Sequence, residues 1–177
     1  MSSITIAYDA THDNIGRLPE NAQAVGYWTG GPGVLWTAAD RAAHPGAVQV
    51  CQDAGATYAA ADVLDVERGA ATTADVGPWA HAALESRRAA ARAGQRSPLI
   101  YANASMITPV ANALVAARLD DGSVGLFVAN WSLTRAQAVA DVLAASGPFP
   151  IRGIQFSDDG PYDVDVFETA WLSARSV

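Results

Sequence analysis

The chain has 177 residues, half of them hydrophobic, and its 11 basic and 18 acidic side chains give a net charge of −7. Such a negative field repels nucleic acid phosphates and anionic membrane surfaces, so neither is an expected partner. A single cysteine, Cys51, excludes an intrachain disulfide and a cysteine-rich zinc site.

The strands are predicted from short runs rich in Val, Ile, Tyr and Trp. These runs alternate with Ala-rich stretches of helical period, which is the pattern of βα units around a parallel sheet. About eight strands are expected on this pattern. Their predicted bounds are 4–9, 24–28, 47–52, 60–67, 99–102, 124–129, 151–156 and 162–167.

Helices are predicted at 37–44, 78–93, 106–118 and 134–144. The first and the last open with Thr-x-x-Asp and Thr-x-x-Gln, which resemble capping boxes. The second has Pro78 in its first turn and Gly94 placed to end it. Its arginines, Arg87, Arg88 and Arg92, are expected to form a solvated basic face.

The order of elements predicts an α/β fold, a compact (β/α)8-type (TIM-like) barrel with reduced early helices. A regular barrel of this type takes about 250 residues, so this chain must shorten its early βα units. Residues 1–177 show no linker-like tract and no internal repeat, and we expect one domain. No basic and apolar signal region is visible at the amino terminus, and no apolar run reaches the roughly 20 residues that span a bilayer. The domain is therefore expected to be soluble.

Acidic residues fall at or near the ends of three predicted strands. Asp9 ends the first strand, while Asp62, Asp65 and Glu67 lie in the fourth. Two more, Asp163 and Asp165, lie in the last. Carboxyl ends of barrel strands meet at one face, where the active sites of such barrels lie, so these side chains predict an acidic site there.

Asp65 and Glu67 lie two residues apart, so both project to the same side of an extended strand. Two carboxyl groups close together in a partly dry site do not both ionise easily, so the pKa of one rises and that group can act as a general acid. Glycoside hydrolysis requires such a pair. The alternative is a solvated strand end, or an ion pair with Arg68.

A resemblance to a known family rests on five segments in chain order. They are Ala7-Tyr8-Asp9, the run from Val63 to Gly69, Leu99-Ile100-Tyr101-Ala102-Asn103, Phe127-Val128-Ala129-Asn130-Trp131 and Gln155-Phe156-Ser157. Together they resemble the family-25 glycoside hydrolases and the glycoside-hydrolase-like barrel proteins of actinobacteria and their phages. The resemblance implies a lysozyme-type muramidase that cleaves the β-1,4 bond after N-acetylmuramic acid in peptidoglycan.

The resemblance also implies roles for individual residues. Glu67 would donate a proton to the glycosidic oxygen, and Asp65 would stabilise either an oxocarbenium-like centre or an oxazolinium formed by the substrate's acetamido group. Asp9 would tune this pair, and either Asp163 or Asp165 would be the late acidic residue. The side chains expected to bind sugar are Tyr8, Trp28, Tyr101, Trp131 and Gln155, together with those two late acids.

Two departures from the family pattern leave a second function open. The chain is short, and Gln155-Phe156 stands where an aromatic-Gln-aromatic run is usual. An inactive barrel that serves as a glycan-binding module or a phage virion component is the alternative. The expected partners are therefore peptidoglycan or another cell-wall polysaccharide, or other virion proteins, and the expected location is the cytoplasm until release, or the virion.

Neither a cofactor nor a metal is expected. His12, His44 and His81 lack metal-ligand spacing. The glycine-rich stretch 29–36 lacks the Lys-Ser/Thr ending of a phosphate-binding loop.

Overall fold

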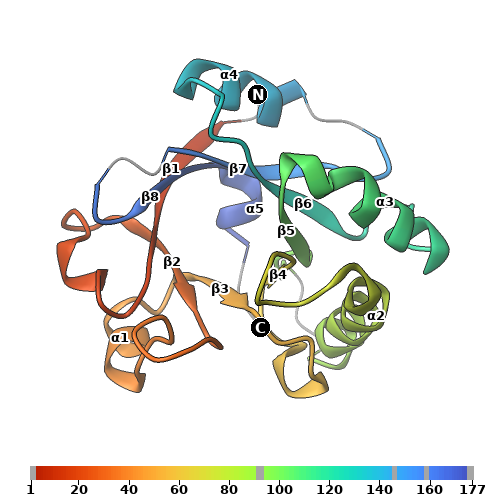
Figure 1. Cartoon of the computed structure of the whole chain (residues 1–177), viewed down its shortest axis with the longest axis horizontal. Helices are drawn as coiled ribbons and strands as arrows, with labels where there is room; N and C mark the ends of the chain where they lie inside the picture. The colour runs from red at the N-terminus through yellow and green to blue at the C-terminus, as the bar shows by residue number, and fades with distance from the viewer. Residues whose placement is uncertain (1–2, 91–93, 145–146, 158–159, 175–177) are drawn as a thin grey trace.

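The eight strands of the protein close into one barrel, in sequence order from β1 to β8 (Figure 1). A computed structural model describes residues 3–90, 94–144, 147–157 and 160–174. Each predicted strand has a counterpart, so the prediction of a compact closed barrel is confirmed. The strands are β1 (Ile4–Ala10), β2 (Gln23–Tyr27), β3 (Val48–Cys51), β4 (Val63–Asp65), β5 (Leu99–Asn103), β6 (Gly125–Ala129), β7 (Ile151–Ser157) and β8 (Asp163–Glu168).

The last strand differs from the predicted parallel sheet. β1 to β7 pair in parallel, whereas β8 is antiparallel to both β7 and β1. The link from Ser157 to Asp163 explains this direction, because it is far shorter than the crossover of about a dozen residues that a parallel return needs. The amino end of β8 therefore lies beside the carboxyl ends of the other strands. We call this end of the barrel the mouth.

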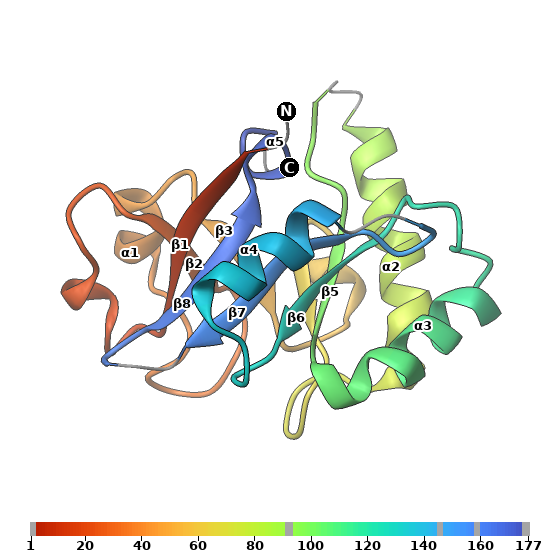
Figure 2. The same cartoon turned by 90° about the horizontal axis from the view of Figure 1, so that it is seen from above.

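Most helices lie around the outside of the barrel (Figures 1 and 2). They are α1 (Ala38–Ala43), α2 (Thr73–Ala89), α3 (Ile107–Ala116), α4 (Arg135–Ala144) and α5 (Thr169–Leu172), with short 3-10 turns η1 (Ile15–Arg17), η2 (Ala56–Tyr58) and η3 (Ala104–Met106). Among the described residues, every helix is too short or too polar to cross a bilayer.

Helix α2 begins earlier than the sequence predicted. The Thr72 side chain and Asp75 form a capping box, so the helix starts at Thr73 and Pro78 lies inside it rather than in its first turn. The helix ends at Ala89, so Gly94, at a φ of 81°, does not cap it. The predicted end at 91–93 lies outside the described residues. The capping box predicted at Thr37 is present, with Asp40 as its partner.

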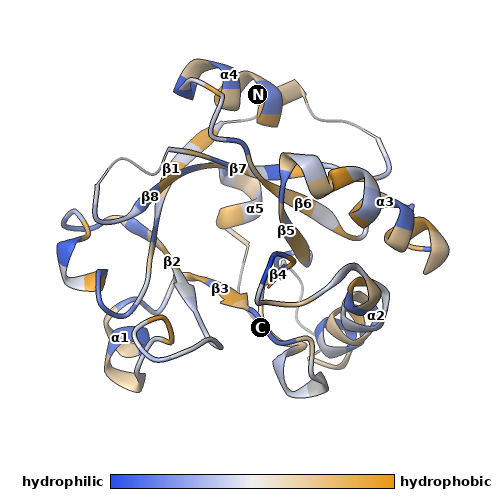
Figure 3. Cartoon of the chain, in the orientation of Figure 1, coloured by the Kyte–Doolittle hydropathy of each residue, from blue (hydrophilic) through white to orange (hydrophobic). Residues whose placement is uncertain are grey.

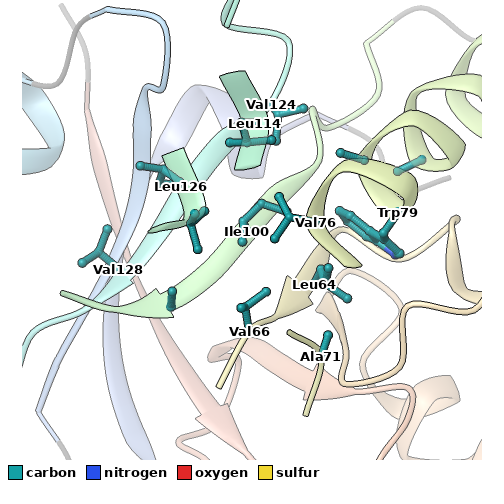
Figure 4. Close-up of a cluster of buried hydrophobic side chains, with 14 of the residues drawn as sticks. Leu64, Val66, Ala71, Val76, Trp79, Ile100, Leu114, Val124, Leu126 and Val128 are labelled. Atoms are coloured by element: carbon teal, nitrogen blue, oxygen red, sulfur yellow. The ribbon is translucent and has the colours of Figure 1, made fainter. Parts of the chain in front are cut away.

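Apolar side chains form one layer inside the barrel and another between the barrel and its helices. Along β4, Val63 belongs to the inner layer, while Leu64 packs outward (Figure 4). The outer layer also contains Trp79 of α2 and Leu114 of α3. Figure 3 shows the resulting apolar ring of strands. The alternation fixes which side chains of each strand reach the interior of the mouth.

Trp36 covers the outside of the barrel where the early helices are reduced. Its ring is fully buried, packs with Ala24 and Ala47, and donates a hydrogen bond to the Ala10 carbonyl. A Cβ atom at Gly26 of β2 would lie 2.3 Å from this ring, so only glycine admits the contact. Trp36 therefore does not plug the mouth.

The end of the barrel opposite the mouth is closed by α5 and a buried ionic cluster. Trp171 of α5 stacks on Phe167 and belongs to the inner apolar layer. Arg96 pairs with Asp62 at 2.8 Å, and Arg87 approaches the same carboxylate at 3.9 Å. Arg87 is buried, so the predicted solvated arginine face is wrong at that position, and Asp62 lies at the far end from the mouth.

Candidate functional site

Three strands and the turn that follows one of them bring carboxyl groups to the mouth. Asp9 of β1 lies opposite Asp163 of β8 in the strand register, which the antiparallel direction of β8 makes possible. Asp165 lies two residues further along β8, beside Gln155 of β7. Asp65 ends β4, and Glu67 follows in the turn after it. Of the acids predicted at the strand ends, these five lie close enough to influence one another, whereas Asp62 lies at the opposite end of the barrel.

Asp65 and Glu67 form a directly interacting pair. Asp65 is fully buried, whereas Glu67 is exposed. Burial and repulsion from the nearby Glu67 carboxylate raise the Asp65 pKa from 3.8 to about 7. The Asp65 Oδ1 atom is buried without a hydrogen-bond partner, which agrees with this direction. Below about pH 7 the pair therefore holds a proton at a group that water does not reach.

Gln52 is a partner of this pair that the sequence did not reveal. Its Nε2 donates a hydrogen bond to Asp65 Oδ2 at 3.0 Å, which favours the charged carboxylate and lowers its pKa. Gln52 directly follows β3, the neighbour of β4 in the barrel. The position of Gln52 just beyond a strand end is the feature of the sequence that could have identified it as a site residue.

A hydrogen-bonded network lies on the other side of the mouth, centred on the buried Gln155 amide. Its Oε1 accepts from the Tyr101 hydroxyl at 2.6 Å, and its Nε2 donates to Asp163 at 3.2 Å and to Asp9 at 3.5 Å. Tyr27 also donates to Asp9, at 3.2 Å. The network holds two carboxyl groups beside each other in the barrel interior.

Burial and mutual repulsion raise the pKa values of two acids on this side of the site. Desolvation and the charge of Asp163 raise the pKa of Asp9 well above 3.8, although the Tyr27 hydroxyl opposes the shift. Desolvation and the charge of Asp9 do the same for Asp165. Neither Asp165 oxygen has a partner at ordinary hydrogen-bond geometry, so the adjacent Gln155 amide only partly offsets its burial.

The structure distinguishes the two late acids by depth. Asp163 is half-buried and lies level with Asp9, whereas Asp165 is fully buried one pair deeper. Among the described residues, no group of three or more His, Cys, Asp or Glu has a geometry suited to a metal ion.

The structure places some of the predicted aromatic residues at the mouth and others outside the barrel. Tyr101 faces the mouth, and Trp131 is 44% exposed after β6, where the neighbouring Asn130 N–H bonds the Gln155 carbonyl. Tyr8 faces outward and packs edge-on against Tyr162, because it alternates with Asp9.

Trp28 also lies outside the barrel interior, against Trp36 and beneath the Arg41 guanidinium. It lines a 380 Å³ cavity beside the mouth together with Gln52 and Tyr58. The structure therefore does not bring Tyr8 or Trp28 to the carboxyl groups. Tyr27, which the sequence reading missed, occupies the inward position of β2.

The alternative of an ion pair between Arg68 and the Asp65–Glu67 pair is wrong, because Arg68 forms no ion pair among the described residues. Arg68 is exposed and lines a separate groove behind Glu67. Glu67 therefore presents an uncompensated carboxyl group at the rim of the mouth.

Comparison with protein-family models finds no match, and searches of curated proteins and of solved structures find no significant match either. Functional inference for this chain accordingly rests on the geometry of the mouth and on the ordered segments of its sequence.

Proposed function

We propose that this protein is a lysozyme-type glycoside hydrolase, similar to family 25, that cleaves β-1,4 bonds of peptidoglycan. The observation that carries the proposal is the Asp65–Glu67 pair, in which burial and the charge of the exposed Glu67 raise the pKa of the buried Asp65 carboxyl group to about 7. We take the barrel as a compact variant of the (β/α)8 barrel, in which β8 is reversed.

Glu67 is the member of the pair that reaches solvent, so it is the carboxyl group that donates a proton to the glycosidic oxygen. Asp65 cannot itself contact the sugar while it is buried beneath Glu67. This burial favours attack by the substrate's own acetamido group, with Asp65 holding a proton beside Glu67.

The test is the clearing of purified cell walls by wild type and Glu67→Gln. Glutamine keeps the size of the side chain but cannot donate an acidic proton, so the clearing rate should fall on the order of 10²–10⁴-fold. Equal rates for the two proteins would exclude Glu67 as the acid. Circular dichroism of both proteins checks that the fold is unchanged.

A second function is favoured by the burial of the remaining acids. Asp9 is 6% exposed and Asp65 and Asp165 are fully buried, so a sugar entering the mouth meets few of them directly. A glycan-binding or virion module that keeps the barrel would have this property. Sedimentation with cell walls that are never cleared by wild type would support this alternative.

The pH dependence provides an independent check of the proton donor. The wild-type rate should fall as the pH rises through about 7, because Asp65 then loses its proton. Gln52→Leu removes the hydrogen bond that favours the Asp65 carboxylate, so the alkaline limb should move up by about one pH unit.

The matched control for this shift is Gln23→Leu. The Gln23 amide donates only to the carbonyls of Ala24 and Gly46, at the far end of the barrel. The alkaline limb of the Gln23→Leu pH–rate profile should stay at the wild-type pH. If Gln52→Leu also leaves the alkaline limb unchanged, the fall in rate above about pH 7 does not come from deprotonation of Asp65.

A further inference from the structure

A groove with apolar walls opens on the helix side of Glu67. It has a volume of about 430 Å³ and lies between the turn after β4 and the η3 turn after β5. Val66, Ala71, Thr73 and Met106 supply its walls. Val66 and Ala71 lie on the helix-facing side of β4 in Figure 4. The turn that carries Glu67 projects at the mouth (Figure 2), and Glu67 lines this groove while its charge acts on Asp9 and Asp65 of the carboxyl cluster.

The rim of the groove carries two polar groups able to bind a ligand. Arg68 is exposed and forms no ion pair or hydrogen bond with other described residues. Asn103 uses its Oδ1 to accept from the Ser105 N–H and hydroxyl, which leaves its amide N–H groups as donors. The groove thus combines an apolar interior with a cation and an amide donor at its edge.

The chemistry of these walls suits a short peptide better than another sugar ring. Sugar rings carry hydroxyl groups around their edges, which need polar partners or an aromatic face, whereas this groove has a mainly apolar interior and no aromatic residue in its lining. A methyl side chain such as that of alanine would bury apolar surface against Val66, Ala71 and Met106, and no polar group of that side chain would lose its water. A carboxylate further along the peptide would reach the unpaired Arg68 guanidinium.

We propose that this groove binds the peptide substituent of the peptidoglycan sugar whose glycosidic oxygen lies at Glu67. The inference rests on the proposed function, since peptidoglycan is the polysaccharide whose sugar carries an alanine-first peptide containing an acidic residue. Glu67 borders both the groove and the cluster, so sugar and peptide would occupy adjoining spaces. The groove would then select peptide-bearing glycan over bare glycan.

The test measures binding, so it does not depend on catalysis. Two probes without a cleavable glycosidic bond are titrated into the full chain: muramyl dipeptide, and N-acetylmuramic acid with its lactyl carboxyl blocked as the methylamide. Burial of one methyl group with a rim ion pair should make the dipeptide bind roughly five- to tenfold more tightly. Equal affinities, or no binding of either probe, would overturn the inference.

Substitutions in α2 test whether the groove is the origin of the preference for the dipeptide probe. Thr73→Phe fills the groove and should bring the affinity ratio close to one, while Ala74→Phe adds the same bulk at an exposed neighbour outside it and should leave the ratio unchanged. Arg68→Ala should lower the ratio part of the way. A ratio that Thr73→Phe does not change would also overturn the groove as the peptide site.

The outcome is distinguishable from that of the hydrolase proposal. Wall clearing by wild type together with equal probe affinities would keep the hydrolase and reject the peptide groove. A dipeptide preference without any clearing would support the groove and assign it to a binding module.

Discussion

Replacing Arg96 by methionine is expected to destabilise the protein by roughly 3–5 kcal/mol, the cost of removing one partner from a buried ion pair. The Arg96 guanidinium is 4% exposed and pairs with the fully buried Asp62. It also donates hydrogen bonds to the carbonyls of Gly46, Ala47 and Leu172. Methionine fills a similar volume but leaves these buried acceptors without their donor. Urea unfolding measures the change in the free energy of unfolding.

The matched control is Arg152→Met. Arg152 also pairs with a carboxylate, that of Glu168, but its side chain is 33% exposed. Solvent screening limits such a pair to about 1 kcal/mol or less. If the two variants lose similar free energies of unfolding, the buried Arg96–Asp62 pair contributes no more to stability than the exposed Arg152–Glu168 pair.

The reason for the large effect is the position of Arg96 rather than its charge alone. The residues it contacts precede β3 and β4 or belong to α5, so one side chain joins three separate segments at the closed end of the barrel. Arg96 also lies 5.4 Å from the centre of the Trp171 ring. The stability contributed by the Arg96 cluster at the closed end thus offsets the cost of burying carboxyl groups at the mouth.

The strands were predictable from sequence because each is a short apolar run between turn-forming residues. The direction of β8 was also within reach, since the few residues between Ser157 and Asp163 cannot hold a crossover helix. The alternation of side chains within β8 says nothing about direction. Counting the length of each connection would therefore have corrected the parallel assignment.

The candidate site was predictable where strand alternation is decisive. Asp9 and Tyr8 are neighbours, so only one of them faces the interior, and the assignment of both to the site contradicted the strand geometry. β2 is different, because it is buried on both faces. Tyr27 and Trp28 are both aromatic, and the packing of Trp36 on Gly26, distant in sequence, decides which one turns inward.

The identity of the proton-holding residue was beyond the sequence. The Asp-x-Glu spacing predicts that one pKa of the pair rises, but burial decides which one. β4 ends at Asp65, and the chain then turns through residues 67–70, with Gly69 at a φ of 93°. That turn exposes Glu67 and leaves Asp65 inside, so the raised pKa belongs to Asp65.

Asp65→Asn is expected to stabilise the protein at pH 7 while it removes activity. The folded-state pKa of Asp65 is raised from 3.8 to about 7, so the stability that its protonation provides is complete below about pH 4 and is lost as the pH rises through 7. Asparagine is neutral at every pH and regains up to roughly 4 kcal/mol at pH 7. The Tm at pH 7 should rise by roughly 10 °C.

Asparagine also keeps the hydrogen bond at this position, because its oxygen can accept from Gln52 as Asp65 does. The acidic proton of Asp65 is lost, however, so the wall-clearing rate should fall on the order of 10²-fold or more. Thermal unfolding at pH 4 and pH 7 separates the two effects, because the gain should be small at pH 4. Asp53→Asn, at an exposed carboxyl group, is the control and should show little change at either pH.

The combination of outcomes distinguishes a proton donor from a merely buried acid. A variant that gains no stability at pH 7 would show that Asp65 is already ionised in the folded protein, which would remove the proton from the pair. A variant that becomes more stable and still clears walls would leave Asp65 without a part in catalysis. Loss of activity with a gain in stability is the trade-off of a site where a carboxyl group is kept dry for chemistry at the expense of the fold.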